Sequence, residues 1–138
     1  MSWIGVDFGA KRVGIAVSQS GTIATPLAVV DRTRGTDAVI EAILAVGDEY
    51  EADTIVLGIP SGGRKAPSAN LKLYEDFAGV LRERTGLVVE LWDEQYSTTE
   101  ASRLAREAGY GKAPKDRIDA MAAAVILQSW LDSRGGSS

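Results

Sequence analysis

The sequence contains no cysteine and no histidine among its 138 residues. The absence of cysteine excludes disulfides, thiolate zinc sites and cysteine nucleophiles, and it fits a reducing cytoplasm. The absence of histidine excludes imidazole metal ligands and every histidine-based catalytic triad. Any chemistry must therefore rest on carboxylates, hydroxyl groups, lysine, arginine or tyrosine.

The sequence also lacks a long apolar run of the kind that crosses a membrane, and it lacks a basic N-terminal region followed by an apolar one. Neither a membrane helix nor a signal peptide is indicated. The length and the 45% hydrophobic content are typical of a single domain with its own core. We expect a cytoplasmic protein with one domain over residues 1–133 and a disordered tail over 134–138.

The net charge of −4 argues at first against a nucleic-acid partner. Residues 36–53, however, hold six acids and no lysine or arginine, and in the rest of the chain 13 acids face 15 bases. Either this segment is simply a solubilising acidic helix, or the molecule is polarised and its other face meets phosphate. Several bases fall in predicted loops: Lys11, Arg12, Arg64, Lys65, Lys112 and Lys115.

The order of apolar patterns predicts an α/β fold. Strands are expected over 3–8, 13–18, 22–30, 54–60 and 87–94, and helices over 36–50, 69–85, 97–109 and from about Asp116 to Ser133. Short connections make the first three strands antiparallel, whereas the last two should run parallel. We therefore expect a five-stranded mixed sheet with helices on both faces.

Asp7 interrupts the first strand, which otherwise consists of apolar residues and glycine. Strand alternation places it on a face with Trp3 and Gly5, and the next strand offers Gly14 and Ala16 there. This face has little side-chain bulk. In the simpler interpretation a helix packs closely on it and Asp7 is a turn residue before Gly9.

The last predicted helix favours a functional interpretation. Asp119 lies in line with the stripe Ala122, Ala123, Ile126 and Trp130, so it points along the buried side. A small-faced strand and a small-faced helix, each with an inward acid, predict that Asp7 and Asp119 meet. Asp93 and Glu94, at the end of the fifth strand, should lie at the same edge of the sheet.

Converging carboxylates repel one another unless a cation lies between them. With oxygen ligands alone the ion should be hard, Mg²⁺ or Mn²⁺. Two such ions about 4 Å apart would suit phosphodiester hydrolysis. The sequence does not choose between the two metals.

Four motifs carry a resemblance to a known family: DFGAKRVGIAVS (7–18), LGIP (57–60), DEQYSTTEAS (93–102) and RIDAMAAAVILQSWL (117–131). The chain resembles the YqgF/RuvX family of Holliday-junction-resolvase-like nucleases, which have a ribonuclease H-like fold. The resemblance implies that Asp7, Glu94 and Asp119 are the catalytic and metal-binding acids. It also implies maturation of the 5′ end of pre-16S ribosomal RNA, within a ribosome precursor, or action on branched DNA.

The chain departs from the family pattern at two places. Gln95 stands where many members carry arginine, and SGGRKAPSA (61–69) replaces an Asn-rich turn. We expect Lys11, Arg12, Arg64 and Lys65 to border the site and contact substrate phosphates.

Two other interpretations remain open. VDFGAKRVGIAV also resembles the first phosphate loop of actin-like sugar kinases, although no second phosphate loop or adenosine loop follows. Alternatively, the chain is a non-catalytic module that binds RNA or protein and whose acids are structural. The sequence also leaves open RNA or DNA as substrate, endo- or exonuclease action, and a monomer or the symmetric dimer that junction resolution would require.

Overall fold

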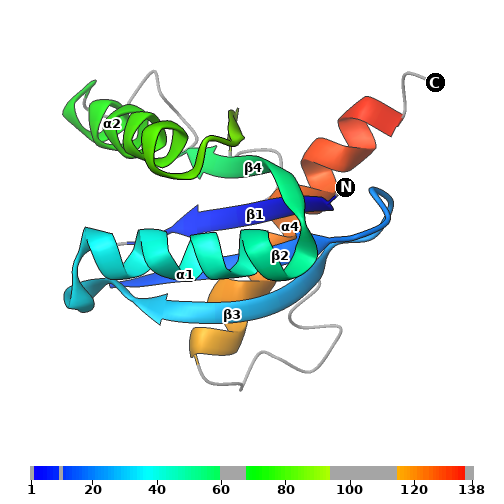
Figure 1. Cartoon of the computed structure of the whole chain (residues 1–138), viewed down its shortest axis with the longest axis horizontal. Helices are drawn as coiled ribbons and strands as arrows, with labels where there is room; N and C mark the ends of the chain where they lie inside the picture. Colours follow the sequence, from blue (N-terminus) through cyan, green and yellow to red (C-terminus); the bar gives the residue numbers. More distant parts are fainter. Residues whose placement is uncertain (1, 10, 60–67, 94–114, 136–138) are drawn as a thin grey trace.

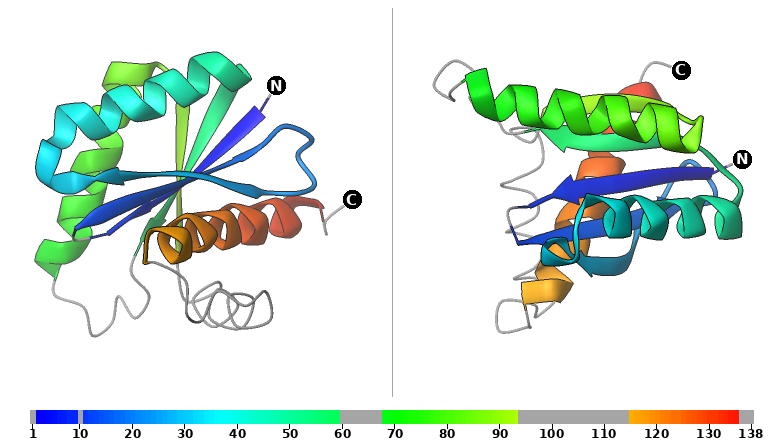
Figure 2. Two further views of the ribbon diagram at one scale, coloured as in Figure 1. Left: turned by 90° about the horizontal axis from the view of Figure 1, so that it is seen from below. Right: turned by 60° about the vertical axis from the view of Figure 1, so that its left-hand side comes forward.

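The computed structural model describes residues 2–9, 11–59, 68–93 and 115–135, which form one mixed sheet with helices on both faces (Figures 1 and 2). The strands are β1 (Ser2–Phe8), β2 (Arg12–Ser18), β3 (Thr25–Asp31), β4 (Ala52–Ile59) and β5 (Val88–Asp93). Their spatial order is β3-β2-β1-β4-β5, in which β1–β2 and β2–β3 are antiparallel and β1–β4 and β4–β5 are parallel. The sheet predicted from the sequence is confirmed, and Asp7 lies on its central strand.

Helices cover the two faces unequally. The described residues form α1 (Thr36–Tyr50), α2 (Ser68–Thr85), α4 (Lys115–Gly135) and a short 3₁₀ turn, η1 (Arg32–Arg34). Among these described helices, α1 and α2 lie on one face of the sheet and α4 lies on the other (Figure 2). The helix predicted over 97–109 lies outside the described residues. None of the helices in the described ranges is long and apolar enough to cross a membrane.

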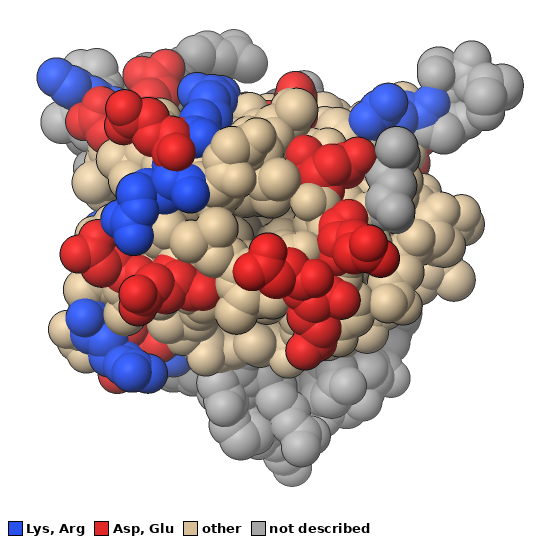
Figure 3. Space-filling view, viewed as in Figure 1, with Lys and Arg blue, Asp and Glu red and all other residues tan. Residues whose placement is uncertain are grey.

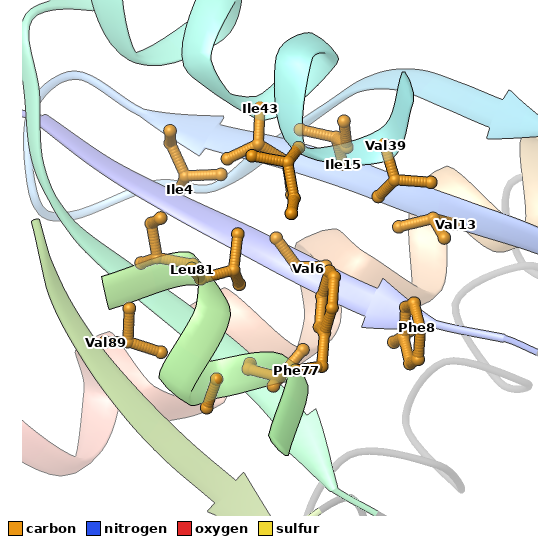
Figure 4. Close-up of a cluster of buried hydrophobic side chains, with 14 of the residues drawn as sticks. Ile4, Val6, Phe8, Val13, Ile15, Val39, Ile43, Phe77, Leu81 and Val89 are labelled. Carbon is orange, nitrogen blue, oxygen red and sulfur yellow. The ribbon is translucent and has the colours of Figure 1, made fainter. Parts of the chain in front are cut away.

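The main core lies between the sheet and the pair α1 and α2 (Figure 4). Alternation along β1 points Ile4, Val6 and Phe8 to this face, and all three are buried. Helical periodicity points Val39, Ile40 and Ile43 of α1 back at them. Burial of each large apolar side chain contributes about 1.5–3 kcal/mol, which anchors β1 as the fixed frame of the molecule.

The opposite face of β1 lies almost against the backbone of α4. A Cβ atom at Gly5 would lie 2.7 Å from both the Ala123 carbonyl oxygen and the Leu127 Cβ. The bulk-free face predicted from the sequence is therefore the surface on which a helix packs closely. The stripe in contact is centred on Ala123 and Leu127, both fully buried, whereas Ala122 is half-buried. The predicted stripe is thus rotated by about one residue.

The described element boundaries agree with the predicted ones to within two residues, except at the start of β3. β3 starts at Thr25 rather than at residue 22, because Gly21, with φ of 79°, and Thr22 donate backbone hydrogen bonds to the hydroxyls of Ser18 and Ser20. These bonds form a turn instead of extending the strand. The last helix, α4, continues to Gly135 instead of ending at about Ser133. In its last turn the Arg134 guanidinium lies 4.7 Å from the Trp130 ring centroid.

Candidate active site

Asp7 lies near the carboxyl end of β1, on the face covered by α4. It is half-buried, and its partners in the two adjacent ladders are Gly14 of β2 and Gly58 of β4. Neither of these two partners has a side chain. Strand alternation placed Gly14 on this face, whereas Gly58 was not predicted, because the register of β4 against β1 is not visible in the sequence.

Gly14 lies next to both Asp7 and Asp119. A Cβ atom at Gly14 would overlap the Asp119 carbonyl oxygen and would lie 3.1 Å from the Ala120 nitrogen. The backbone of α4 therefore rests on the residue that pairs with Asp7 in the ladder. Paired residues of an antiparallel ladder have Cα atoms about 4.5–5.5 Å apart. The structure thus brings these two acids, distant in the sequence, to either side of one glycine.

Asp119 forms an ion pair with Arg12. Nε of Arg12 donates a hydrogen bond to Asp119 Oδ2 at 2.6 Å, and the two side chains are 34% and 27% exposed. Arg12 was expected to contact substrate phosphates, and its pairing with Asp119 was not predicted. The signal was present, because Arg12 lies two residues before Gly14 on β2 and strand alternation gives both the same face.

The third predicted acid, Glu94, follows the last residue of β5 in the sequence. Gly58 and Ile59 of β4 pair with Trp92 and Asp93 of β5, so the carboxyl ends of β1, β4 and β5 lie along one edge. With strands about 4.8 Å apart, the end of β5 lies about 10 Å from β1. Glu94 itself is outside the described residues, as are Arg64 and Lys65. Within the described ranges no three acidic side chains gather as a metal cluster.

The donor set nevertheless fits a hard divalent cation. Carboxylate oxygens are the ligands that Mg²⁺ and Mn²⁺ prefer. The contact between Arg12 and Asp119 shows that the Asp119 carboxylate already binds a positive group. Asp7, on the other side of Gly14, would add a second carboxylate to the same place.

The chain directly after Asp7 is held by two side chains from other elements. The Tyr74 hydroxyl donates to the Phe8 carbonyl at 3.2 Å, and Arg32 Nη1 donates to the Gly9 carbonyl at 3.0 Å. The Arg32 guanidinium also lies 4.0 Å from the Phe8 ring centroid. Nothing in the sequence pattern identified Arg32.

A cavity of about 430 Å³ adjoins Arg12, lined by Lys11, Arg12, Val29, Asp31 and Thr33. Lys11 is exposed there. Hydrogen bonds from the Thr33 hydroxyl and backbone N–H hold the pKa of Asp31 below its ordinary value of 3.8. This cavity is where the described part of the chain could receive a phosphate close to Asp119.

The acidic segment lies away from this site. Figure 3 shows acidic side chains gathered over the face that α1 covers, and Asp37, Glu41, Asp48 and Glu49 are exposed on that helix. Asp7 lies on the opposite face of the sheet, under α4, and Asp119 belongs to α4. The net charge of −4 is therefore a poor guide to the surroundings of the site.

Curated relatives match nearly the whole chain. A protein of Anaeromyxobacter sp. (strain Fw109-5) is 40% identical over 136 residues, which cover 97% of this chain and 98% of the relative, and is named "Putative pre-16S rRNA nuclease". A protein of Geobacillus kaustophilus (strain HTA426) with the same name is 41% identical over 138 residues, covering 97% and 99%.

A solved structure supports the fold. RuvC of Thermus thermophilus, in complex with a Holliday junction substrate, superposes with a TM-score of 0.62 at 16% identity and covers 100% of this chain and 98% of its own. At that identity the likeness shows the ribonuclease H-like fold alone. The model of the family described as "RuvX: Holliday junction resolvase" matches residues 1–133, which sets aside the sugar-kinase interpretation. The chain belongs to the RuvX family, whose relatives are named as nucleases, enzymes that hydrolyse the ester bonds of nucleic acid.

Proposed function

We propose that this protein is a divalent-metal-dependent nuclease that cleaves structured nucleic acid. Its active site would consist of Asp7, Glu94 and Asp119. One observation carries the proposal: Gly14 pairs with Asp7 in the sheet and supports the backbone of Asp119. Two carboxylates that converge on a small-faced sheet would repel each other unless a cation lies between them. The protein's membership of a nuclease family supports the same conclusion.

The three acids would hold Mg²⁺ or Mn²⁺, as two ions. When bound, the metal supplies a water of lowered pKa and neutralises charge on the leaving oxygen. The chain itself provides the geometry. The position of Asp7 is fixed because β1 is the central strand. The position of Asp119 is fixed because α4 packs closely against Gly5 and Gly14.

Basic side chains around the acids would hold the phosphates of the substrate. Lys11 and Arg12 line the cavity beside Asp119, and Arg64 and Lys65 are proposed to extend this contact. Such contacts position the nucleic-acid backbone without reading its sequence. This arrangement suits a substrate recognised by its shape.

The proposed substrate is the 5′ end of pre-16S ribosomal RNA in a ribosome precursor in the cytoplasm. The names of the relatives support it, and the RuvC complex with a Holliday junction makes branched DNA the second substrate to test. The Arg12–Asp119 ion pair favours one rival function. In that alternative the acids are structural and the chain binds RNA or protein without cleaving it.

Cleavage assays separate these functions. End-labelled structured RNA and a four-way DNA junction would be incubated with Mg²⁺, Mn²⁺ or EDTA, with the Asp7→Asn variant as the control. We expect cleavage that requires metal and falls by orders of magnitude in the variant, because electrostatic stabilisation worth several kcal/mol is lost. Binding without cleavage in every metal would instead support the non-catalytic module.

A further inference from the structure

Arg12 contacts Asp119 through a single atom of its guanidinium. Nε donates to Oδ2 at 2.6 Å, and Nη1 and Nη2 take no part in this bond. Both side chains are about one-third exposed or less, so water screens the pair incompletely. The Arg12 guanidinium therefore already binds one oxygen of Asp119, the carboxylate that the proposed function assigns to a metal.

The fold fixes this contact. Arg12 is the first residue of β2, and Gly14, two residues on, is covered by the backbone of Asp119. Strand alternation gives Arg12 the same face as Gly14, so its side chain starts on the side where α4 lies. Arg12 also pairs with Asp31 of β3 in the ladder, and both residues line the cavity together with Lys11 and Thr33.

We propose that Arg12 is an internal cation that competes with the metal at Asp119, and that metal binding releases its guanidinium to a phosphate of the nucleic acid. The inference rests on the proposed function, because it takes Asp119 as a metal ligand. A divalent ion at Asp119 would repel a guanidinium at the same carboxylate. The cavity beside Arg12 gives the released guanidinium a place where a substrate phosphate can meet it.

The exchange couples two binding events. While Arg12 neutralises Asp119 it is withheld from phosphate, and while metal neutralises Asp119 it is available as a bidentate phosphate ligand. Metal and nucleic acid must then strengthen each other's binding by the same factor. Arg12 is therefore a positioning residue: it contacts Asp119 when the metal is absent and a substrate phosphate when the metal is bound.

Calorimetric titration of Mn²⁺ into the full chain tests the competition. The variants are Arg12→Gln, Arg12→Lys and, as a charge-matched control, Arg34→Gln, which removes a charge from the exposed η1 turn. We expect Arg12→Gln to bind Mn²⁺ at least threefold more tightly than the wild type, and Arg34→Gln to match the wild type. Arg12→Lys keeps a cation and should stay close to the wild type, and circular dichroism would verify that each variant is folded.

Binding of a four-way DNA junction in Ca²⁺ or EDTA tests the coupling, with gels to verify that the strands stay intact. Ca²⁺ should tighten binding by the wild type more than by Arg12→Gln. The inference is overturned if Arg12→Gln binds Mn²⁺ no more tightly than the wild type, or if the Ca²⁺ effect is the same in both. If the wild type binds Mn²⁺ no better than Asp7→Asn does, the proposed metal site fails and the inference fails with it.

Discussion

Gly14 and Asp119 are in backbone contact, and a single methyl group on Gly14 would overlap the carbonyl oxygen of Asp119. Because Gly14 also pairs with Asp7, this contact sets the distance between the two acids of the candidate site. The stability of the α4 packing and the geometry of the site therefore depend on the same glycine.

Gly14→Ala should lower the free energy of unfolding by about 1–3 kcal/mol, because the added Cβ must push the α4 backbone away. It should also weaken Mn²⁺ binding, because Asp119 moves with the helix. The matched control is Gly79→Ala in α2, where an added Cβ meets no atom within 4 Å. That change should stabilise the protein by about 0.5–1 kcal/mol. Urea unfolding of both variants checks the pair, and equal destabilisation would contradict the close contact at Gly14.

Asp119→Asn should slightly destabilise the metal-free protein. From the sequence alone, removing one of several neighbouring acids is expected to relieve repulsion and to leave stability unchanged or raised. The ion pair with Arg12 reverses that expectation, because its loss leaves the guanidinium without its partner. At this exposure the pair is worth about 0.2–1 kcal/mol. Melting in EDTA, with Arg12→Gln and the double variant completing a mutant cycle, should give a coupling of that size; a coupling of zero would show that the pair is not maintained in solution.

Lys11→Gln should weaken binding of nucleic acid for all sequences alike. Loss of one phosphate contact reduces the slope of log affinity against log salt by about one unit. Arg134→Gln is the control, because 15 residues of α4 separate it from Asp119, or about 22 Å of helix. Fluorescence anisotropy at several salt concentrations gives the slopes. An unchanged slope for Lys11→Gln would show that the substrate approaches another surface.

Asp31 should titrate below its ordinary pKa of 3.8, because the Thr33 hydroxyl and backbone N–H hydrogen-bond its charged form. A carboxyl group with a depressed pKa contributes stability above its unfolded pKa, and this contribution is lost as the pH falls through the folded value. Thr33→Val removes the hydroxyl donor, so the pKa of Asp31 should rise toward 3.8. Carboxyl-carbon NMR titration measures it directly. The same pKa in both proteins would mean that Thr33 does not stabilise the charge.

Much of the fold was predictable because its signals are local. Alternation separated Ile4, Val6 and Phe8 from Gly5 and Asp7, and the structure shows the first three in the core and Gly5 under α4. The helix predicted over 36–50 coincides with α1. The start of β3 was missed because the Ser18 and Ser20 hydroxyls compete for backbone N–H groups, which periodicity does not record.

The candidate site was predictable in part. The close approach of α4 to the strand face that holds Asp7 followed from small residues on both partners, a pattern that close packing requires. Strand alternation gives Arg12 the face of Gly14, but its pairing with Asp119, like the place of Gly58 beside Asp7, also depends on long-range contacts that no sequence window contains. The role of Arg32 was not predicted for the same reason, because its hydrogen bond to the Gly9 carbonyl connects segments that are distant in the sequence.

The most direct test of the central claim is a crystal structure with Mn²⁺ that locates the metal by its anomalous scattering. We expect Mn²⁺ bound by the carboxylates of Asp7 and Asp119, with Glu94 as the third ligand, and no such density in crystals of Asp7→Asn. The side chain of Arg12 should then have left Asp119. Density for Mn²⁺ elsewhere, or none at these carboxylates when the ion is in excess, would contradict the account.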